Sequence, residues 1–307
     1  MESVIVGYFF PKCIGVIFFF NKLNKALFCM DNILCPIDFS PYSLNALEYA
    51  ASILEVRTGK LTIIHVFSEK EMIQYFGNNQ SDDQTNNLKD FAVQKLRVLA
   101  NETHASFNIK CDYILSIGDV NTAINKYTQE HDIDYVVMGT QGNGYNKETV
   151  IGSRTMRTVD SSTVPILTVP IQAQFSGLQS VVYASDYSKY DKVTLQRLVS
   201  FIYNFKSRIK VVHISHSKSQ MTEKVYDEFK SELSTFLGYE KISYYLKEHK
   251  EDISHGIEEF VNEQEGELLV LLKRKRNFFE SLLSSSVSTE VSYFSSHPLL
   301  IFQEPEY

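Results

Sequence analysis

The stretch VVMGTQGNGYNKETVIGSRT, residues 136–155, contains the patterns of a strand, a glycine-rich loop and a helix start in succession. An apolar run ends at Gly139, as a buried strand does, and Gly142 and Gly144 follow in a polar loop. Gly152 then precedes the start of a helix. Strand, glycine-rich loop and helix in this order are typical of an α/β protein. A loop of this kind is also a common way to hold a phosphate.

Strand and helix patterns alternate on both sides of this stretch, from Met30 onward. Ser40 and Pro41 have the N-cap and first-turn roles that begin a helix, with Leu44, Leu47, Ala51 and Leu54 on its apolar face. We expect strands at 32–37, 61–67, 107–115, 135–138 and 165–169, further helices at 88–104, 120–131 and 153–160, and a loop over much of the polar segment 71–90. This alternation predicts a mainly parallel sheet with helices on both faces.

The second half of the chain repeats the first. SVVYASDYSKY (180–190) aligns with NILCPIDFSPY (32–42), and KVVHISH (210–216) with TIIHVFS (62–68), at one constant offset. EDISHGIEEF (251–260) aligns with GDVNTAINKY (118–127), and HPLLIF (297–302) with VPILTV (164–169), at an offset smaller by about fifteen residues. One deletion in a duplicated domain, in the region of 71–90, explains both offsets.

The repeat predicts two tandem Rossmann-like domains, each with a mainly parallel five-stranded sheet and helices on both faces. We expect the first domain at residues 30–172 and the second at 178–307. The two copies are expected to form an intramolecular pseudo-dimer through their last strands, 165–169 and 298–302. A further homodimer is left open.

Composition indicates a soluble globular protein, with 44% hydrophobic and 22% charged residues. A net charge of −7 argues against nucleic acid as a partner, because such binders need a basic face. The four cysteines are scattered: Cys13, Cys29, Cys35 and Cys111. They form no CxxC pair and no Cys/His cluster at metal-ligand spacing, so we expect no metal site. The absence of a disulfide pattern favours a reducing compartment, and we expect a cytoplasmic location.

Residues 1–29 are apolar and aromatic and do not fit this picture. Their longest uncharged run, 13–20, is shorter than the roughly 20 residues that span a bilayer, and they lack the features of a signal peptide. We favour Met30 as the natural start, which makes 1–29 a mis-annotated extension. The alternative is a membrane-associating segment.

Ligands of parallel α/β sheets bind at the carboxyl ends of the strands, where Asp38 and Gly139 are expected to lie. The Gly139-x2-Gly142 turn lets backbone N–H groups approach a ligand, and Gly152-Ser153 offers the positive end of a helix dipole. Flexible loops also use glycine, so the glycines alone leave a phosphate site and a plain loop as equal alternatives. Asp38 is equally a candidate turn or cap residue beside Ser40.

The spacing Gly139-x2-Gly142-x9-Gly152-Ser153, after a strand ending in Met-Gly, resembles the ATP-binding signature of the universal stress protein family. ILCPIDFSPYSLNALEYA resembles that family's first strand, turn and first helix, LTIIHVF its second strand and VPILTVP its last. The resemblance covers nearly all of 30–170 and, more faintly, 178–303. It implies an adenine nucleotide alpha hydrolase-like fold, a tandem member of the family, and ATP, ADP or AMP as ligand, with or without Mg²⁺.

The resemblance also implies residue roles in the first copy. Pro36, Asp38 and Val66 match the positions that hold adenine and ribose. A second set matches those around the ribose and phosphates: Gly139, Gly142, Gly152, Ser153 and Thr155. His65, inside a strand, is expected to be a hydrogen-bonded, partly buried histidine without a catalytic role.

The second copy departs from the signature, although Asp186 remains at the position of Asp38. The aligned residues are Leu272, Lys275, Ser285 and Ser286 in place of Gly139, Gly142, Gly152 and Ser153. Side chains at Leu272 and Lys275 would fill space that phosphates need. We therefore predict one nucleotide site per chain, in the first copy.

The leading hypothesis is an ATP-binding module that acts in stress response or signalling through an unknown protein partner. The sequence offers no catalytic residues, because no general base or activated nucleophile is evident. Two alternatives are a slow ATPase, with Mg²⁺ held by the phosphates and the hydroxyls of Ser153 and Thr155, and a nucleotide-free interaction scaffold.

Overall fold

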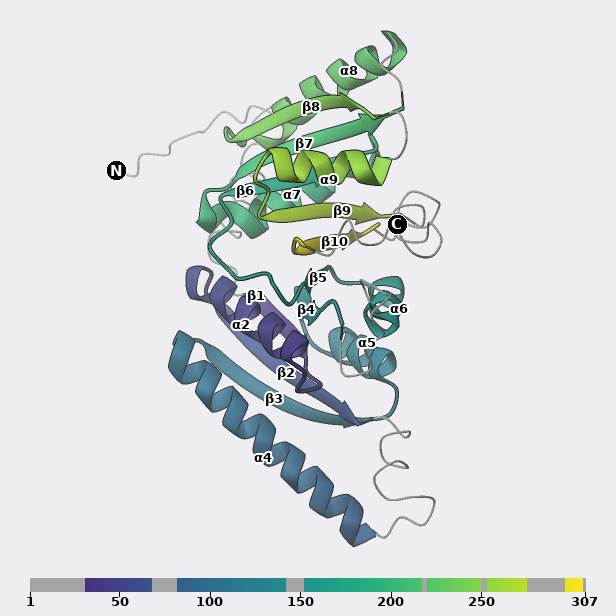
Figure 1. The fold of residues 1–307 in the computed structure, drawn as a ribbon. Helices are drawn as coiled ribbons and strands as arrows, with labels where there is room; N and C mark the ends of the chain where they lie inside the picture. The colour runs from purple at the N-terminus through teal and green to yellow at the C-terminus, as the bar shows by residue number, and fades with distance from the viewer. Residues whose placement is uncertain are drawn as a thin grey trace, which may run out of the picture.

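The computed structural model describes residues 31–67, 82–141, 152–216, 220–249, 253–274 and 296–305. Its described strands form one ten-stranded sheet in the order β3-β2-β1-β4-β5-β10-β9-β6-β7-β8 (Figure 1). The first copy contributes β1 (Asp31–Pro36), β2 (Gly59–Phe67), β3 (Lys110–Ile117), β4 (Tyr135–Gly139) and β5 (Ile166–Val169). The second contributes β6 (Ser180–Ala184), β7 (Arg208–Ser215), β8 (Ile242–Glu248), β9 (Leu268–Lys273) and β10 (Leu299–Gln303).

The two copies meet at the pair β5–β10. Leu167 lies opposite Leu300 in this antiparallel pair, whereas the other strand pairs of the sheet are parallel. The expected pairing through the last strands is therefore confirmed. Each copy keeps five strands, and the predicted α/β class with two tandem Rossmann-like domains is confirmed as well.

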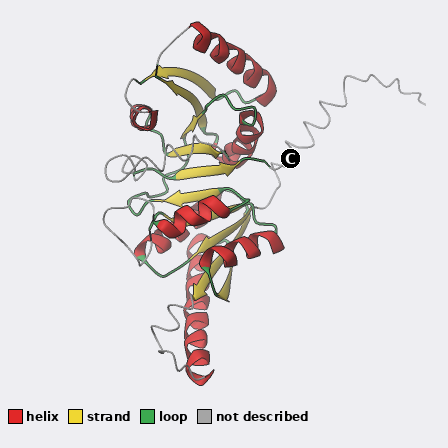
Figure 2. Ribbon diagram, turned by 90° about the vertical axis from the view of Figure 1, so that its right-hand side faces the viewer, coloured by secondary structure: helices red, strands yellow, loops and turns green. Residues whose placement is uncertain are grey.

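Helices cover both faces of the sheet (Figure 2). One face carries α2 (Pro41–Val56), α4 (Asp82–Phe107), α7 (Asp191–Ile202) and α8 (Gln220–Leu237), with a short 3-10 turn, η1 (Tyr203–Phe205), after α7. The other face carries α5 (Val120–Glu130), α6 (Ser153–Ser161) and α9 (Ile253–Glu263). Their burial patterns follow the expected amphipathic rule, because the apolar side of each helix packs on the strands.

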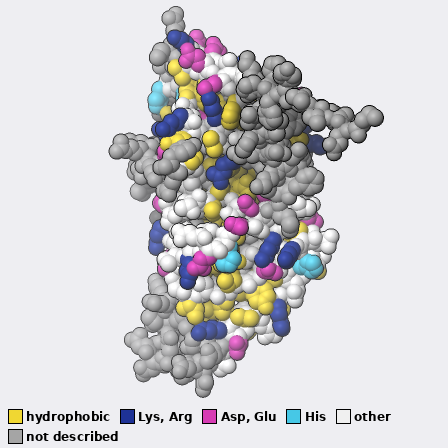
Figure 3. All heavy atoms as spheres, turned by 180° about the vertical axis from the view of Figure 1, so that it is seen from behind, with side chains coloured by type: hydrophobic (Ala, Val, Ile, Leu, Met, Phe, Trp, Pro, Cys, Tyr) yellow, Lys and Arg dark blue, Asp and Glu magenta, His cyan; other side chains and the backbone are white. Residues whose placement is uncertain are grey.

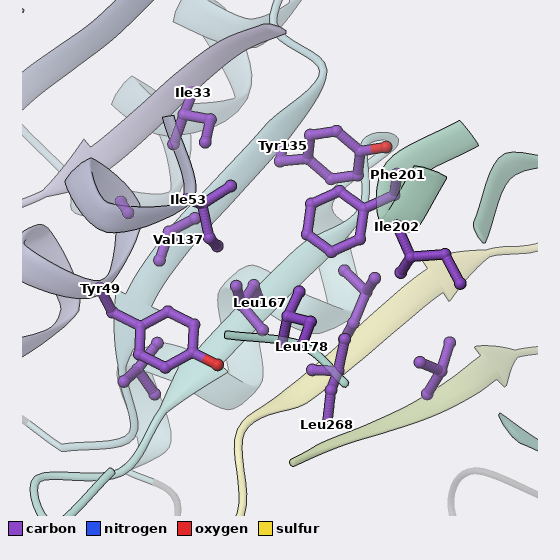
Figure 4. Close-up of a cluster of buried hydrophobic side chains, with 14 of the residues drawn as sticks. Ile33, Tyr49, Ile53, Tyr135, Val137, Leu167, Leu178, Phe201, Ile202 and Leu268 are labelled. Atoms are coloured by element: carbon purple, nitrogen blue, oxygen red, sulfur yellow. The ribbon is translucent and has the colours of Figure 1, made fainter. Parts of the chain in front are cut away.

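Each face has a core that runs through both copies. Figure 4 shows the core on the α2 and α7 face, where Tyr135 of β4 packs against Phe201 of α7 with ring centroids 4.9 Å apart. Leu178, in the connection between the copies, lies in the same cluster and is 1% exposed. The copies therefore share buried apolar surface as well as backbone hydrogen bonds.

Two local expectations were wrong. Residues 82–87, expected in the loop before a helix from residue 88, begin α4, and the later part of that helix has a buried stripe at Ala92, Leu96 and Ala100. The polar first turns carry no apolar periodicity, which is the pattern that predicts a helix. Leu44, expected on the buried face of α2, is 38% exposed, while Ala46, Tyr49 and Ala50 are buried beside the other predicted residues.

The deletion inferred from the offsets falls between the second and third strands of the second copy. There α8 has 18 residues where α4 has 26. Residues 1–29 lie outside the described part of the chain. Within that part, no helix combines the length and apolar character needed to cross a membrane.

On the face shown in Figure 3, Lys and Arg side chains lie beside Asp and Glu side chains across the described surface. Neither sign of charge forms a continuous patch on the described part of this face (Figure 3).

Candidate functional site

The carboxyl ends of β1 and β4 form the point where the chain crosses between the two helix layers. β1 pairs with β4 on one side and with β2 on the other. After β1 the chain enters α2 on one face, whereas after β4 it enters α6 on the opposite face. Pro36 and Gly139 end these two strands, so the predicted site residues lie at the switch point, where parallel α/β sheets bind ligands.

Asp38 stands in a tight turn between β1 and α2. Its Oδ1 accepts a hydrogen bond of 3.0 Å from the N–H of Ser40, and Ser40 in turn caps α2 by accepting from the N–H of Ser43. Phe39 has a φ of 61°, a conformation that non-glycine side chains rarely adopt. The cap role considered for Asp38 is therefore present, and the strained turn holds its half-buried carboxyl group at the strand end.

His65 supports this turn from the neighbouring strand. Its Nδ1 lies 2.6 Å from the carbonyl oxygen of Ile37, and its ring lies 4.9 Å from that of Phe39. The second copy repeats the arrangement, with His213 Nδ1 2.8 Å from the carbonyl oxygen of Ser185. Both histidines are thus hydrogen-bonded strand residues that hold the turn, as expected of His65.

Val66 lies near the end of β2 and is 7% exposed within the core cluster on the α5 and α6 face. Its position at the strand end beside β1 provides an apolar wall close to the switch point.

Gly139 is a glycine for a packing reason. A Cβ at this position would lie 2.8 Å from the carbonyl oxygen of Tyr42, in the first turn of α2. We expected glycine here because it lets a ligand approach the backbone. The structure shows a second reason: α2 approaches β4 too closely to leave room for a side chain. The carbonyl oxygen of Gly139 accepts a hydrogen bond of 3.1 Å from Thr155 Oγ1, which ties α6 to β4.

Thr155 is 3% exposed, so its hydroxyl is used inside the protein to position α6. Ser153, by contrast, is exposed at the first position of the helix. A second bond holds the same junction, because the N–H of Gly152 donates to the carbonyl oxygen of Thr140 at 2.7 Å. Of the two hydroxyls expected near phosphate, the structure leaves that of Ser153 facing outward. Gly142 lies outside the described residues.

The start of α6 differs from the starts of α2 and α5. Ser40 caps α2 and Asp119 caps α5 through side-chain oxygens, whereas the N-cap of α6 is Gly152, which has no side chain to do so. An α-helix leaves its first N–H groups without intrahelical acceptors and carries a positive partial charge there. A Cβ at Gly152 would meet the carbonyl oxygen of Thr140 at 3.5 Å, an ordinary van der Waals contact, so packing alone does not require glycine here.

The equivalent switch point of the second copy contains an ion pair. Asp186, the counterpart of Asp38, accepts from Arg274 Nη1, which lies at the position of Gln141. Leu272, at the position of Gly139, is 5% exposed and belongs to the core. The sequence predicts the obstruction at Leu272 but not the pairing of Arg274, whose partner lies 88 residues away. Lys275, Ser285 and Ser286 lie outside the described residues.

Lys273 connects the second copy to α6. Its Nζ lies 2.9 Å from Oδ1 of Asp160 and 2.9 Å from the carbonyl oxygen of Val159, in the last turn of α6. A cation at a helix C-terminus opposes the negative end of the helix dipole. The second copy thereby stabilises the far end of the same helix.

Comparison with known proteins places this geometry in a family context. The model of the Universal stress protein family matches residues 30–170 and 177–303. Universal stress protein MJ0577 of Methanocaldococcus jannaschii is 25% identical over 151 residues, which cover 45% of this chain and 93% of that protein. Universal stress protein YxiE of Bacillus subtilis is 26% identical over 148 residues, 45% of this chain and 98% of that protein.

A solved structure extends the likeness to both copies. The crystal structure of a universal stress protein from Archaeoglobus fulgidus covers 89% of this chain and 96% of that chain, with a TM-score of 0.70 and 17% identity. At this identity the match shows a shared fold. Its coverage shows that the tandem arrangement also occurs in another protein.

Proposed function

This chain belongs to the universal stress protein family, and from that membership we propose that its first copy binds ATP or a related adenine nucleotide while the second copy binds none. The observation that carries the proposal is the contrast between the two switch points. In the first, Asp38 follows β1, and Gly152, which has no capping side chain, precedes α6 after the neighbouring strand β4. In the second, the guanidinium of Arg274 is paired with Asp186.

Each part of the first site suits a part of the nucleotide. Pro36 and Val66 offer apolar surface for adenine, and the carboxyl group of Asp38 is an acceptor for ribose hydroxyls or an adenine N–H. The N–H groups in the first turn of α6, from Ser153 onward, together with the helix dipole, suit phosphate oxygens, whereas the N–H of Gly152 is already bonded to Thr140. Gly142, in the signature loop, is assigned to the phosphates by the family resemblance.

Bound Mg²⁺ would be held by the phosphates and the Ser153 hydroxyl, since Mg²⁺ prefers oxygen ligands and keeps several waters. The hydroxyl of Thr155 instead holds α6 against β4 and acts on the site by positioning that helix. We assign no catalytic residue. The nucleotide acts as a signal that biases contact with a protein partner in stress response.

The test uses matched variants of the two copies. Asp38→Asn keeps an oxygen that can accept from Ser40 but removes the charge, and Asp186→Asn makes the same change in the second copy. ATP binding is measured by isothermal titration, and small molecules released from freshly purified protein are identified by mass spectrometry. We expect about one site per chain, at least tenfold weaker binding for Asp38→Asn, and unchanged binding for Asp186→Asn.

A third variant, Gln141→Arg, copies the residue that pairs with Asp186. Placed at the end of β4, the new guanidinium should pair with Asp38 and abolish binding. Equal loss from Asp38→Asn and Asp186→Asn would contradict the assignment to the first copy. If the purified protein carries no nucleotide and binds no added ATP, the chain is a scaffold. If it hydrolyses ATP and Ser153→Ala abolishes this activity, it is a slow ATPase.

A further inference from the structure

The second copy brings two histidines and a glutamate together at the end of β8. His249 directly follows that strand, and His255 and Glu259 lie one turn apart on α9. One donor atom from each residue lies within 4.8 Å of the other two. Among the described residues this is the group of His, Cys, Asp and Glu side chains with metal-ligand proximity. We propose that it binds one zinc ion or a similar late divalent transition metal.

The distances between donor atoms fit a small coordination sphere. Nε2 of His255 lies 3.2 Å from one carboxylate oxygen of Glu259, and Nε2 of His249 lies 3.7 Å from the other. Ligands about 2.0–2.1 Å from a tetrahedral zinc ion are roughly 3.3 Å apart. Each imidazole is therefore near the required distance from one oxygen of the carboxylate. Because the three donor atoms lie within 4.8 Å of one another, side-chain shifts of up to about 1.5 Å complete the set.

The backbone holds these donors near one another. Gly256 follows His255 on α9, and a Cβ there would lie 2.9 Å from the Cβ of His249 and 2.9 Å from Cγ2 of Ile214. Only glycine permits so close an approach of the helix to the strand end. The N–H of His249 also donates to the carbonyl oxygen of Ser215 at 2.9 Å, which holds its backbone against β7.

Donor chemistry favours zinc over magnesium or calcium. Two imidazole nitrogens and one carboxylate oxygen suit zinc, copper, nickel or cobalt, whereas magnesium and calcium require mostly oxygen ligands. His249 is 17% exposed and Glu259 54% exposed at the side chain, so one side of the cluster faces solvent. Three protein ligands and one water would complete a tetrahedral site.

The first copy shows that the fold does not require these residues. In α5 the residues aligned with His255 and Glu259 are Thr122 and Lys126, and the residue after β3 is Gly118. The same strand end and helix start therefore exist there with no donor at any of the three positions. The cluster is an addition in the second copy, placed away from the switch point that Asp186 occupies.

The sequence carried a weak signal for this site. His255 and Glu259 are four apart on a predicted helix, which places them on one face. His249 joins them only through the turn from β8 into α9, which has no fixed spacing in sequence. The search for Cys/His spacing therefore did not find the cluster.

The full, untagged chain is first stripped of metal with a chelator and dialysed. Zinc binding is then measured by titration against a chromophoric competitor. We expect one zinc per chain in the wild type and at least tenfold weaker binding in His255→Gln and in Glu259→Gln. Cobalt substitution should give the visible absorption of a tetrahedral ion in the wild type and not in the variants.

Glu263→Gln is the matched control, because Glu263 lies one turn further along α9 and pairs with Lys247 at 3.0 Å. Its zinc affinity should equal that of the wild type. Failure of His255→Gln to fold leaves the test with Glu259→Gln, at an exposed position. The proposal would be overturned if the wild type bound no zinc in this titration. It would also be overturned if the wild type and both cluster variants bound zinc with equal affinity.

Discussion

The buried ion pair between Arg57 and Asp31 gives the most direct test of how the copies are joined. Arg57, at the end of α2, makes a two-pronged contact with Asp31, and the two side chains are 4% and 6% exposed. Its Nη1 also donates to the carbonyl oxygens of Ser200, at 2.6 Å, and Phe201, near the end of α7 in the other copy. One guanidinium thus satisfies a carboxylate in the first copy and backbone groups in the second.

We expect Arg57→Met to lower the free energy of unfolding by about 3–5 kcal/mol. Removing one partner of a buried pair leaves an uncompensated charge, which costs this amount. The released carbonyl groups of α7 contribute to the same loss. The double variant with Asp31→Asn should recover part of it, because no buried charge then remains.

The assay is urea unfolding followed by far-UV circular dichroism, since the chain contains no tryptophan. With a slope of about 1–3 kcal/mol per molar urea, the midpoint should fall by at least 1 M. Lys60→Met is the control, because Lys60 and Asp112 form a pair whose side chains are 32% and 51% exposed, which should contribute about 0–1 kcal/mol. A loss below 1 kcal/mol for Arg57→Met would refute the reasoning.

Two further predictions follow from burial and close packing. Burial raises the pKa of Asp191 from 3.8 to about 7, so its contribution to stability is fully present below pH 4 and is lost as pH rises to 7. Asn at position 191 does not titrate, so only the wild type loses this stability. The free energy of unfolding of Asp191→Asn minus that of the wild type should therefore rise over that interval, by on the order of 1.4 kcal/mol per pH unit at most, and stay level above it. A difference that is independent of pH contradicts this. Gly139→Ala should cost about 1–3 kcal/mol in urea unfolding because its Cβ would lie too close to Tyr42. Gly152→Ala, whose Cβ would make ordinary contacts, should cost less than about 1 kcal/mol; equal losses would show that the backbone at Gly139 relaxes freely.

The sequence predicted the parts of the fold that depend on local pattern and on the repeat. Alternating strand and helix patterns gave the sheet class, and the aligned ends VPILTV and HPLLIF predicted the β5–β10 pair. The first turns of α4 escaped because exposed polar helix carries no apolar stripe. Leu44 was misplaced because the buried face of α2 is wider than one stripe and is centred on other residues.

The turn at Asp38 and the helix start at Gly152 were predictable, because turn and helix-start chemistry is local. The site was not predictable where distant residues meet. Arg274 reaches Asp186 only because β9 lies beside β6 in the sheet, and Lys273 reaches Asp160 only across the junction of the two copies. Thr155 was assigned to phosphate by the family resemblance, yet its hydroxyl is donated to Gly139.

The junction between β5 and β10 has a consequence for how such a pair behaves on dilution. Two separate single-domain chains joined through these strands would come apart as their concentration falls. Here both strands belong to one chain, so their pairing is a unimolecular event with an effective concentration set by the short connection between the copies. A covalent pair is also always composed of one first copy and one second copy. The second copy can therefore lack the glycines of the signature loop and carry Arg274 and Lys273, while the first copy keeps those glycines. The two remain paired at any protein concentration.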